Sequence, residues 1–75
     1  MSKRLPVVKP KEAIGALEKA GWYVHHQRGS HVSMHKEGVP DLVIIPLHSG
    51  DLPKGTLHAI IEDAGLSIEQ FLELL

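Results

Sequence analysis

The sequence contains no cysteine, which removes disulfides, thiolate metal ligands and cysteine nucleophiles from consideration. This absence is typical of a protein that works in a reducing compartment. Long hydrophobic runs are also missing, since the longest, residues 42–47, is far shorter than the roughly 20 residues needed to cross a bilayer. The positive charges near the N-terminus precede Pro6 instead of an apolar stretch, so they do not indicate a signal peptide. We therefore expect neither membrane insertion nor export, and a cytoplasmic location.

The 75 residues are 43 % apolar and 23 % charged, which is the composition of one small globular domain. A chain of this length buries only about 60 % of the surface that it exposes when unfolded, so we expect modest stability unless a partner covers it. The formal charge of −1 conceals a split, because residues 1–36 hold seven Lys or Arg against two Glu. This basic half can attract phosphate locally, since charges act over about 8 Å at physiological salt.

The order of the sequence signals predicts an α+β fold with the arrangement α-β-β-β-α. A helix is expected to begin at Pro10, because proline suits the first helical position. It should end at Gly21, because glycine readily adopts the left-handed conformation that ends helices. Alternation predicts three strands, and helical spacing with a capping box at Ser67 predicts two final helices. The expected ranges are 22–28, 32–36 and 41–45 for the strands, then 56–64 and 68–75 for the helices. We expect the helices on one face of a three-stranded antiparallel sheet, residues 1–9 as a flexible arm and residues 10–75 as a single domain.

The loop between the first two strands decides which side chains face the core. In a regular hairpin, a two-residue turn at Gly29 and Ser30 would mix apolar and polar side chains on each face. We therefore expect a three-residue loop that ends at His31 and directs four apolar side chains inward: Trp22, Val24, Val32 and Met34. The outward face would then carry Tyr23, His25, Gln27, Ser33 and His35. In this register His25 and His35 are direct cross-strand neighbours, with Cβ atoms roughly 5 Å apart.

Among the six histidines, His31 stands out because it follows Arg28, Gly29 and Ser30 on a loop that should be exposed. A histidine side chain ordinarily titrates near pH 6.5, so it can take a proton from a ribose 2′-OH or give one to the leaving 5′-oxygen. Arg28 and backbone N–H groups of the loop could stabilise the charged phosphate. These residues favour metal-free cleavage of RNA. From the residues alone, the alternative that His31 is a solvated side chain without a catalytic role stays open.

Two other kinds of site fit the sequence less well. His25 and His35 offer at most two good ligands on one face, whereas zinc needs three or four, so no metal or other cofactor is expected. Residues 60–67 followed by a capped helix have the turn of a helix-turn-helix motif. The second helix has two acidic residues, no Lys or Arg, and Gln70 as its one possible base reader. DNA reading is therefore the weakest alternative.

Five segments in fixed order identify a family resemblance: LEKAGW at 17–22, QRGSH at 27–31, PLHSG at 46–50, KGTLHAI at 54–60 and AGLS at 64–67. Together they resemble the HicA toxins, small mRNA interferases of bacterial and archaeal toxin–antitoxin pairs, and the resemblance runs from about Leu5 to Leu75. It implies a double-stranded-RNA-binding-like fold, ribosome-independent cleavage of mRNA without a cofactor, and a HicB-like antitoxin that covers the active site. It also implies that His31, the histidine of Gly-Ser-His, is catalytic.

The chain departs from the family in its fourth segment. Family members commonly carry Lys or Arg in the helix after Gly-Thr-Leu, where this chain has His58, Glu62 and Asp63, so this helix should contribute little to RNA binding. RNA binding would then depend on Lys3, Arg4, Lys9, Lys11, Lys19, Arg28, Gly29, Ser30, Lys36 and Lys54. The second proton-transfer group stays open between His48 and His25. A double-stranded-RNA-binding-like module that holds RNA without cutting it also stays open.

Overall fold

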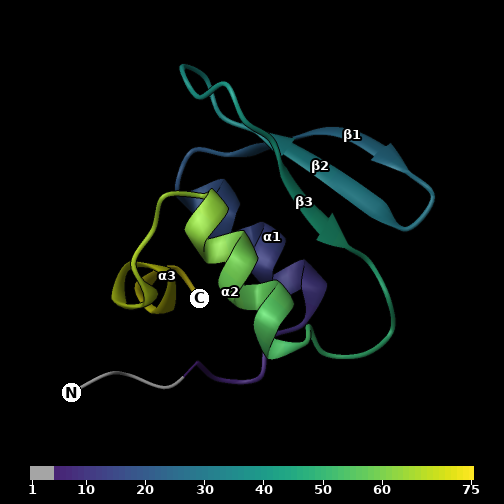
Figure 1. Cartoon of the computed structure of the whole chain (residues 1–75), viewed down its shortest axis with the longest axis vertical. Helices are drawn as coiled ribbons and strands as arrows, with labels where there is room; N and C mark the ends of the chain where they lie inside the picture. The colour runs from purple at the N-terminus through teal and green to yellow at the C-terminus, as the bar shows by residue number, and fades with distance from the viewer. Residues whose placement is uncertain (1–4) are drawn as a thin grey trace.

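The computed structural model describes residues 5–75 (Figure 1). In this part of the chain three helices and three strands follow one another: α1 (Pro10–Lys19), β1 (Tyr23–Arg28), β2 (His31–His35), β3 (Val43–Pro46), α2 (Lys54–Asp63) and α3 (Ile68–Leu74). The strands form an antiparallel sheet of order β1-β2-β3. The expected α+β fold of order α-β-β-β-α, with a short C-terminal helix, is therefore confirmed.

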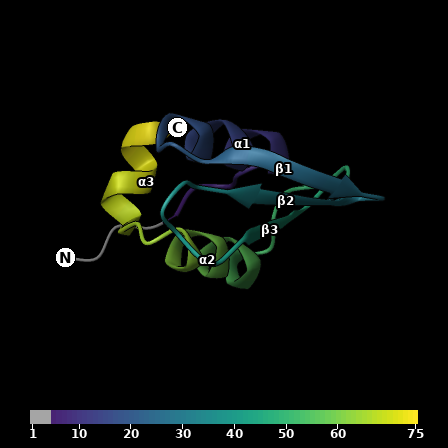
Figure 2. The same ribbon diagram turned by 90° about the horizontal axis from the view of Figure 1, so that it is seen from above.

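The sheet has one covered face and one open face. Helices α1 and α2 lie on the same side of the three strands, and α3 packs against α1 near the C-terminus (Figures 1 and 2). Side chains along β3 are alternately buried and exposed, as are those of β2, so each strand turns one set of side chains toward the helices. Within residues 5–75 no helix covers the opposite face. Side chains on that open face are accessible to a ligand.

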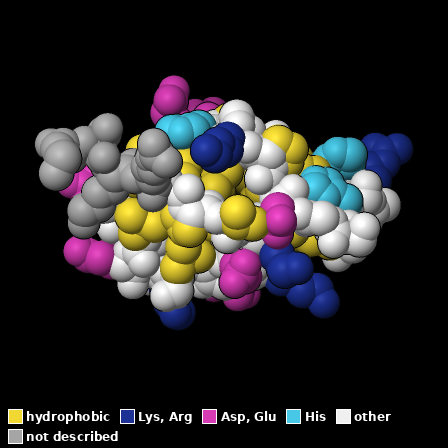
Figure 3. Space-filling view, turned by 90° about the horizontal axis from the view of Figure 1, so that it is seen from below, with side chains coloured by type: hydrophobic (Ala, Val, Ile, Leu, Met, Phe, Trp, Pro, Cys, Tyr) yellow, Lys and Arg dark blue, Asp and Glu magenta, His cyan; other side chains and the backbone are white. Residues whose placement is uncertain are grey.

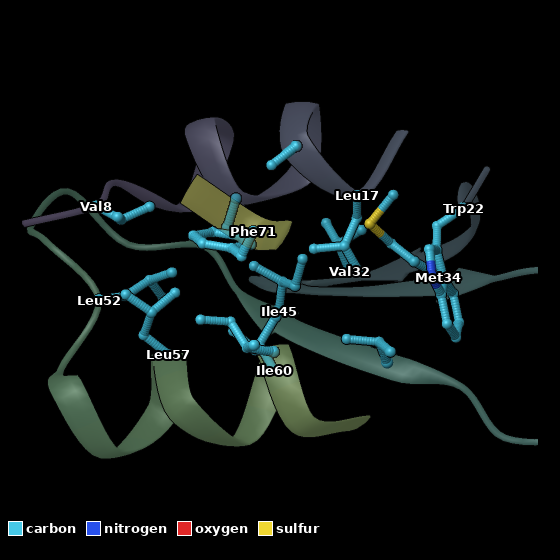
Figure 4. Close-up of a cluster of buried hydrophobic side chains, with 14 residues drawn as sticks. Val8, Leu17, Trp22, Val32, Met34, Ile45, Leu52, Leu57, Ile60 and Phe71 are labelled. Atoms are coloured by element: carbon cyan, nitrogen blue, oxygen red, sulfur yellow. The ribbon is translucent and has the colours of Figure 1, made fainter. Parts of the chain in front are cut away.

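A hydrophobic core fills the space between the sheet and the helices (Figure 4). Met34 and Ile45 enter it from the sheet, Leu17 from α1, Leu57 from α2 and Phe71 from α3, each with at most 1 % of its surface exposed. The other members of this core cluster are Val8, Ala13, Ala16, Trp22, Val32, Val43, Leu52, Ile60 and Ile61. Because the α3 side chain is among the most deeply buried, the short last helix is an integral part of the core.

The signals predicted to bound the first and last helices are present, whereas α2, expected over residues 56–64, begins two residues earlier, at Lys54. The backbone N–H of Lys9 donates to Glu12 Oε1 over 2.9 Å at the start of α1, and Gly21 follows α1 with a φ of +97°. In α3 the backbone N–H of Ser67 donates to Gln70 Oε1, and the backbone N–H of Gln70 donates to Ser67 Oγ. The predicted capping box is thus present, and it satisfies two N–H groups that a helix start would otherwise leave unpaired.

The expected three-residue loop between β1 and β2 is wrong. Arg28 is the Cα partner of His31, which leaves Gly29 and Ser30 as a two-residue turn. Gly29 has a φ of +59° and Ser30 does not have a positive φ, which matches the type II′ turn that carries glycine at its first central position. Tight turns of this type suit the right-handed twist of the paired strands.

A β-bulge explains how the two-residue turn is compatible with the burial of Trp22. The register shifts between Val24 and His26, so His25 is an extra residue that reverses the alternation of all residues before it. Val24 therefore pairs with Met34, as the core requires, and the direct partner of His35 is Tyr23 instead of the expected His25. The expected register is that of a regular hairpin, in which this reversal does not occur.

Strand β1 extends past the helices at the edge of the sheet. All six of its residues are exposed, including Val24, which was expected to be inward and buried but has 45 % of its surface exposed. The reason is its position, since an edge strand that projects beyond the helical layer has nothing to pack against on its inner side. Trp22, immediately before β1, is 3 % exposed, and its indole Nε1 has no hydrogen-bond partner within residues 5–75.

The segment before α1 is packed against the rest of the protein. Val8 is 1 % exposed, and its carbonyl oxygen accepts a hydrogen bond from the backbone N–H of Leu52. The expected flexible arm includes residues 1–4, which lie outside the described residues, so the arm stays a prediction there. Within residues 5–75, none of the helices combines the length and the apolar character that a bilayer crossing requires.

Candidate functional site

His31 is the first residue of β2 and stands at the free end of the hairpin. Its side chain is exposed, and within residues 5–75 its ring forms no hydrogen bond. Its cross-strand partner is Arg28, the last residue of β1, so the imidazole and the guanidinium extend from the same face of the sheet. The turn that joins them, Gly29 and Ser30, is exposed as well. An anion that approaches the hairpin end can therefore meet both side chains.

The open face next to this pair is formed by three strands in register. His31 is the Cα partner of Pro46 on β3, and the next row on this face consists of His26, Ser33 and Ile44. The β3 side of the face is thus apolar, and the β1 side is polar and basic. In Figure 3, which views the molecule from the helix side, histidine side chains and Lys or Arg side chains lie at the end where the hairpin projects.

His35 occupies the far end of the same face and is fixed by two hydrogen bonds. Its Nε2 lies 3.0 Å from the carbonyl oxygen of Val39, and its Nδ1 lies 2.9 Å from the hydroxyl of Tyr23. The His25 ring packs edge-on against it at a centroid distance of 5.9 Å. The expected proximity of His25 and His35 is therefore present, although the bulge produces it in place of direct pairing. Since both ring nitrogens are engaged, His35 is suited to holding structure.

The loop after β3 connects the hairpin to the start of α1. The backbone N–H of Leu47 donates to the carbonyl oxygen of Ser30, which holds the loop against the turn. The following residue, His48, lines a cavity of about 200 Å³ together with Lys9 and Lys11. Sequence reasoning could not place His48, because the loop between Pro46 and α2 has no strand or helix pattern. The structure puts it beside two lysines at the first turn of α1.

The expected RNA-binding residues fall into separate groups. Arg28, Gly29 and Ser30 lie with His31 at the hairpin end, Lys9 and Lys11 lie at the start of α1, and Lys54 begins α2. Lys19 is the last residue of α1, about 14 Å along the helix axis from Pro10, its first residue. Lys36 lies against Gly21, two residues after the end of α1, because a Cβ added to Gly21 would be 3.2 Å from Lys36 Cε. Lys3 and Arg4 lie outside the described residues.

Neither a metal site nor a base-reading helix emerges from the described residues. Between residues 5 and 75 no group of three or more His, Asp or Glu side chains is placed to hold a metal ion. Gln70, the one possible base reader of the helix-turn-helix alternative, uses its side-chain oxygen and its backbone N–H in the α3 cap. The cap thus holds the side-chain oxygen of Gln70 at the helix start, which weakens that alternative further.

The comparisons with known proteins define the class first. Residues 10–66 match a family model described as the HicA toxin of bacterial toxin–antitoxin, and this match covers about three quarters of the chain. The protein is therefore a toxin of a toxin–antitoxin system, which implies an antitoxin partner. More specifically, the chain belongs to the HicA toxin family. No curated protein matches the sequence.

The family match contains most of the expected site. His31, Arg28 and the turn between them lie within residues 10–66, as do four of the lysines, whereas Lys9 precedes the matched range. Sequence reasoning did not single out His26, although the structure places it one row from His31. The signal for it was present in the glycine at position 29, because a two-residue turn puts His26 and His31 on the same face.

Proposed function

We propose that this toxin is a metal-independent RNA endonuclease in which His31 acts as general acid or base and Arg28 stabilises the phosphate. The observation that supports this proposal is the position of His31, exposed at the hairpin end and paired across the turn with Arg28. An imidazole with both nitrogens free of protein hydrogen bonds can exchange protons with a substrate. A guanidinium beside it can form charge-assisted hydrogen bonds to phosphate oxygens.

The reaction uses the ribose of the RNA as nucleophile. The 2′-OH loses its proton and its oxygen attacks the phosphorus, and the bond from phosphorus to the 5′-oxygen breaks as that oxygen gains a proton. Each proton transfer through a positioned side chain contributes about 10² to 10⁴ in rate. DNA lacks the 2′-OH, so this mechanism restricts cleavage to RNA. Messenger RNA is the substrate that the family resemblance implies.

The lysines at the start of α1 and α2 would hold the rest of the RNA. Lys9, Lys11 and Lys54 flank the loop that is hydrogen-bonded to the hairpin turn, so an RNA backbone that reaches His31 can also pass these charges. Phosphate contacts of this kind add affinity without base specificity. Lys19 and Lys36, at the other end of α1, are expected to make weaker contributions to binding at the same scissile phosphate.

The antitoxin partner would cover the open face of the sheet. This face carries exposed apolar side chains on β3 and just before it, with Ile44 at 45 % exposure and Leu42 at 43 %, next to the polar and basic side chains of β1 and β2. Exposed apolar area beside a polar rim is typical of a protein-binding surface. A HicB-like antitoxin bound there would deny RNA access to His31.

Replacing His31 with alanine tests the proposal directly. We expect His31→Ala to lower the rate of cleavage of a mixed mRNA in EDTA by at least about 100-fold. The matched control is His58→Ala, because His58 is an exposed histidine on α2, remote from the open sheet face. If His31→Ala retains cleavage within about threefold of the wild type in EDTA, the proposed role of His31 is wrong.

A binding module that does not cut RNA is the second candidate, and the lysines around the α1 start favour it as well. Contacts to phosphates and 2′-hydroxyls need no proton transfer, so this candidate predicts a gel shift with RNA that remains intact. Incubating purified protein with end-labelled RNA separates the two. Stable complexes without new fragments, at every pH between about 5 and 9, would favour the binding module.

A further inference from the structure

We propose that His26 is the second proton-transfer group of this site, acting as a pair with His31; this inference rests on the proposed RNA cleavage. An in-line displacement needs one group that removes the 2′-OH proton and another that protonates the 5′-oxygen, on opposite sides of the phosphorus. A single imidazole cannot occupy both positions at once. The second group must therefore come from a neighbouring side chain on the same surface.

The register of the hairpin places His26 in that position. Arg28 is the partner of His31 and His26 is the partner of Ser33, so His26 and His31 are diagonal neighbours on adjacent strands. Diagonal neighbours on one face are about 7–8 Å apart between their Cα atoms and somewhat closer between their Cβ atoms, within reach of long and aromatic side chains. Two imidazoles at this spacing can approach one phosphodiester from its two sides.

The other four histidines are placed differently. His35 has both ring nitrogens hydrogen-bonded, to Tyr23 and to Val39, and His25 packs on its ring. His48 lines the cavity at the start of α1, and His58 lies on α2, on the covered side of the sheet. Neither His48 nor His25, the two histidines that the sequence suggested as the second group, is therefore a diagonal neighbour of His31. His26 is such a neighbour, and its side chain is exposed.

The charges around the pair fit a phosphate. The strands that form the open face contain no Asp or Glu, and Arg28 is their only Lys or Arg. The groups that face the pair are Ser33 and Arg28 on the hairpin, then Ile44 and Pro46 on β3. Tyr23, His25 and His35 form the next row. No carboxylate on these strands competes for a protonated imidazole, so an anionic substrate is its natural partner.

The proton balance of the pair closes without any further reactant. One neutral imidazole accepts the 2′-OH proton as the bond from the 2′-oxygen to phosphorus forms. The other imidazole, which is protonated at the start, gives its proton to the 5′-oxygen as the bond from phosphorus to that oxygen breaks. The products are a 2′,3′-cyclic phosphate and a 5′-hydroxyl. The two rings then return to their starting states by exchanging one proton with water.

The test compares two substrates and three variants of the full chain. The substrates are an RNA oligonucleotide and a ribonucleoside 3′-phosphodiester that releases 4-nitrophenolate, a leaving group that departs without being protonated. The variants are His26→Gln, His31→Gln and the matched control His25→Gln, which changes the neighbouring histidine on the same strand. We expect the first two to cleave RNA at least about 100-fold more slowly than the wild type, and the control within about threefold.

The nitrophenyl substrate then divides the two roles. We expect the variant that lacks the general acid to cleave this substrate within about tenfold of the wild-type rate, because the leaving group needs no proton. The variant that lacks the general base should remain slow, since the 2′-OH must still lose its proton. The pH profile of kcat/KM should be bell-shaped for the wild type and lose one limb in each variant, opposite limbs in the two. A merely structural role of His26 would leave both limbs in place.

Other outcomes overturn the inference, and they show whether the proposed RNA cleavage fails with it. If His26→Gln cleaves RNA within about threefold of the wild type while His31→Gln is inactive, His26 is not the second group and the nuclease stands. If the wild type does not cleave RNA, both proposals fail. If circular dichroism shows that His26→Gln is unfolded, His26→Ala takes its place and is assayed with added imidazole. If this variant is folded and imidazole does not restore RNA cleavage, the result counts against the inference.

Discussion

Tyr23 and His35 are joined across the first row of the β1–β2 hairpin by a hydrogen bond of 2.9 Å between the phenol oxygen and Nδ1. Because the carbonyl oxygen of Val39 can only accept, His35 Nε2 carries the hydrogen that faces it. In the neutral ring, Nδ1 then accepts a hydrogen bond from the Tyr23 hydroxyl. The two rings also meet edge-on at a centroid distance of 5.6 Å. This contact fixes the end of the hairpin that is farther from His31.

Replacing Tyr23 with phenylalanine should reduce stability and leave cleavage largely intact. The change keeps the ring contact but removes the hydroxyl, and a partly exposed hydrogen bond of this kind contributes about 0.5–1.5 kcal/mol. We expect a lower free energy of unfolding in urea, and a cleavage rate for Tyr23→Phe within about threefold of the wild type. A loss of cleavage as large as that of His31→Ala would place this row in the catalytic site.

Gly29→Ala tests the turn that presents His31. Gly29 has a φ of +59°, and nothing lies within 4 Å of an added Cβ, so the cost arises from the backbone conformation alone. An L-residue in so sparsely populated a backbone conformation costs about 1–3 kcal/mol, which we expect as a loss of stability in denaturant unfolding. Gly15→Ala is the matched control, because its added Cβ also meets nothing but Gly15 lies within α1, where alanine is favoured. An unchanged stability for Gly29→Ala would mean that the turn is of another type.

The two groups of lysines should differ in their effect on RNA binding. We expect the double variant Lys9→Ala/Lys11→Ala to lower the slope of log Kd against log salt concentration by about 0.7 for each lost phosphate contact to single-stranded RNA. The control pair is Lys19→Ala/Lys36→Ala, which removes the same charge at the other end of α1. Equal changes in slope for the two pairs would show that RNA has no preferred path over the surface.

Lys54→Glu should move stability and RNA binding in opposite directions. Lys54 is the first residue of α2, where the helix dipole disfavours a positive charge, so a glutamate there should stabilise the fold by about 0.3–1 kcal/mol. The same change removes a positive charge and adds a negative one near the RNA path, so affinity should fall. Thermal unfolding and filter binding measure the two effects. A variant with raised stability and unchanged affinity would exclude Lys54 from the RNA contacts.

Phe71→Ala should test whether α3 belongs to the core. The side chain is wholly buried between the helices, and truncation of a buried phenylalanine costs about 3–5 kcal/mol. For a domain of 75 residues this is a large part of the total stability, so we expect the variant to be mostly unfolded near 37 °C. Leu75→Ala, at the exposed end of the chain, is the control. A small effect of Phe71→Ala would contradict the packing in Figure 4.

The fold was predictable because its signals are local. Pro10 and Gly21 bound α1, the Ser67 capping box begins α3, and alternation marks the strands, so each element could be identified from its own residues. The hairpin register was not predictable, because it depends on the β-bulge at His25, which no local residue preference indicates. One extra residue in a strand reverses which side chains share a face.

The candidate site also contains residues that the sequence could place and residues that it could not. The sequence placed His31 beside Arg28 correctly, because His31 is close to Arg28 whether it ends the loop or follows it. It could not place His26 with them, since that depends on the number of residues in the turn. Nor could it bring His48 to Lys9 and Lys11, because this contact joins two loop segments distant in sequence. Long-range contacts between irregular segments carry no periodic signal.

The burial of Trp22 gives the domain its own optical reporter. It is the single tryptophan of the chain, and its indole sits in the core beside the start of β1. Unfolding would transfer this ring to water and change the wavelength of its fluorescence. Because none of the substitutions above replaces Trp22, the same intrinsic emission can follow the folding of every variant without a label.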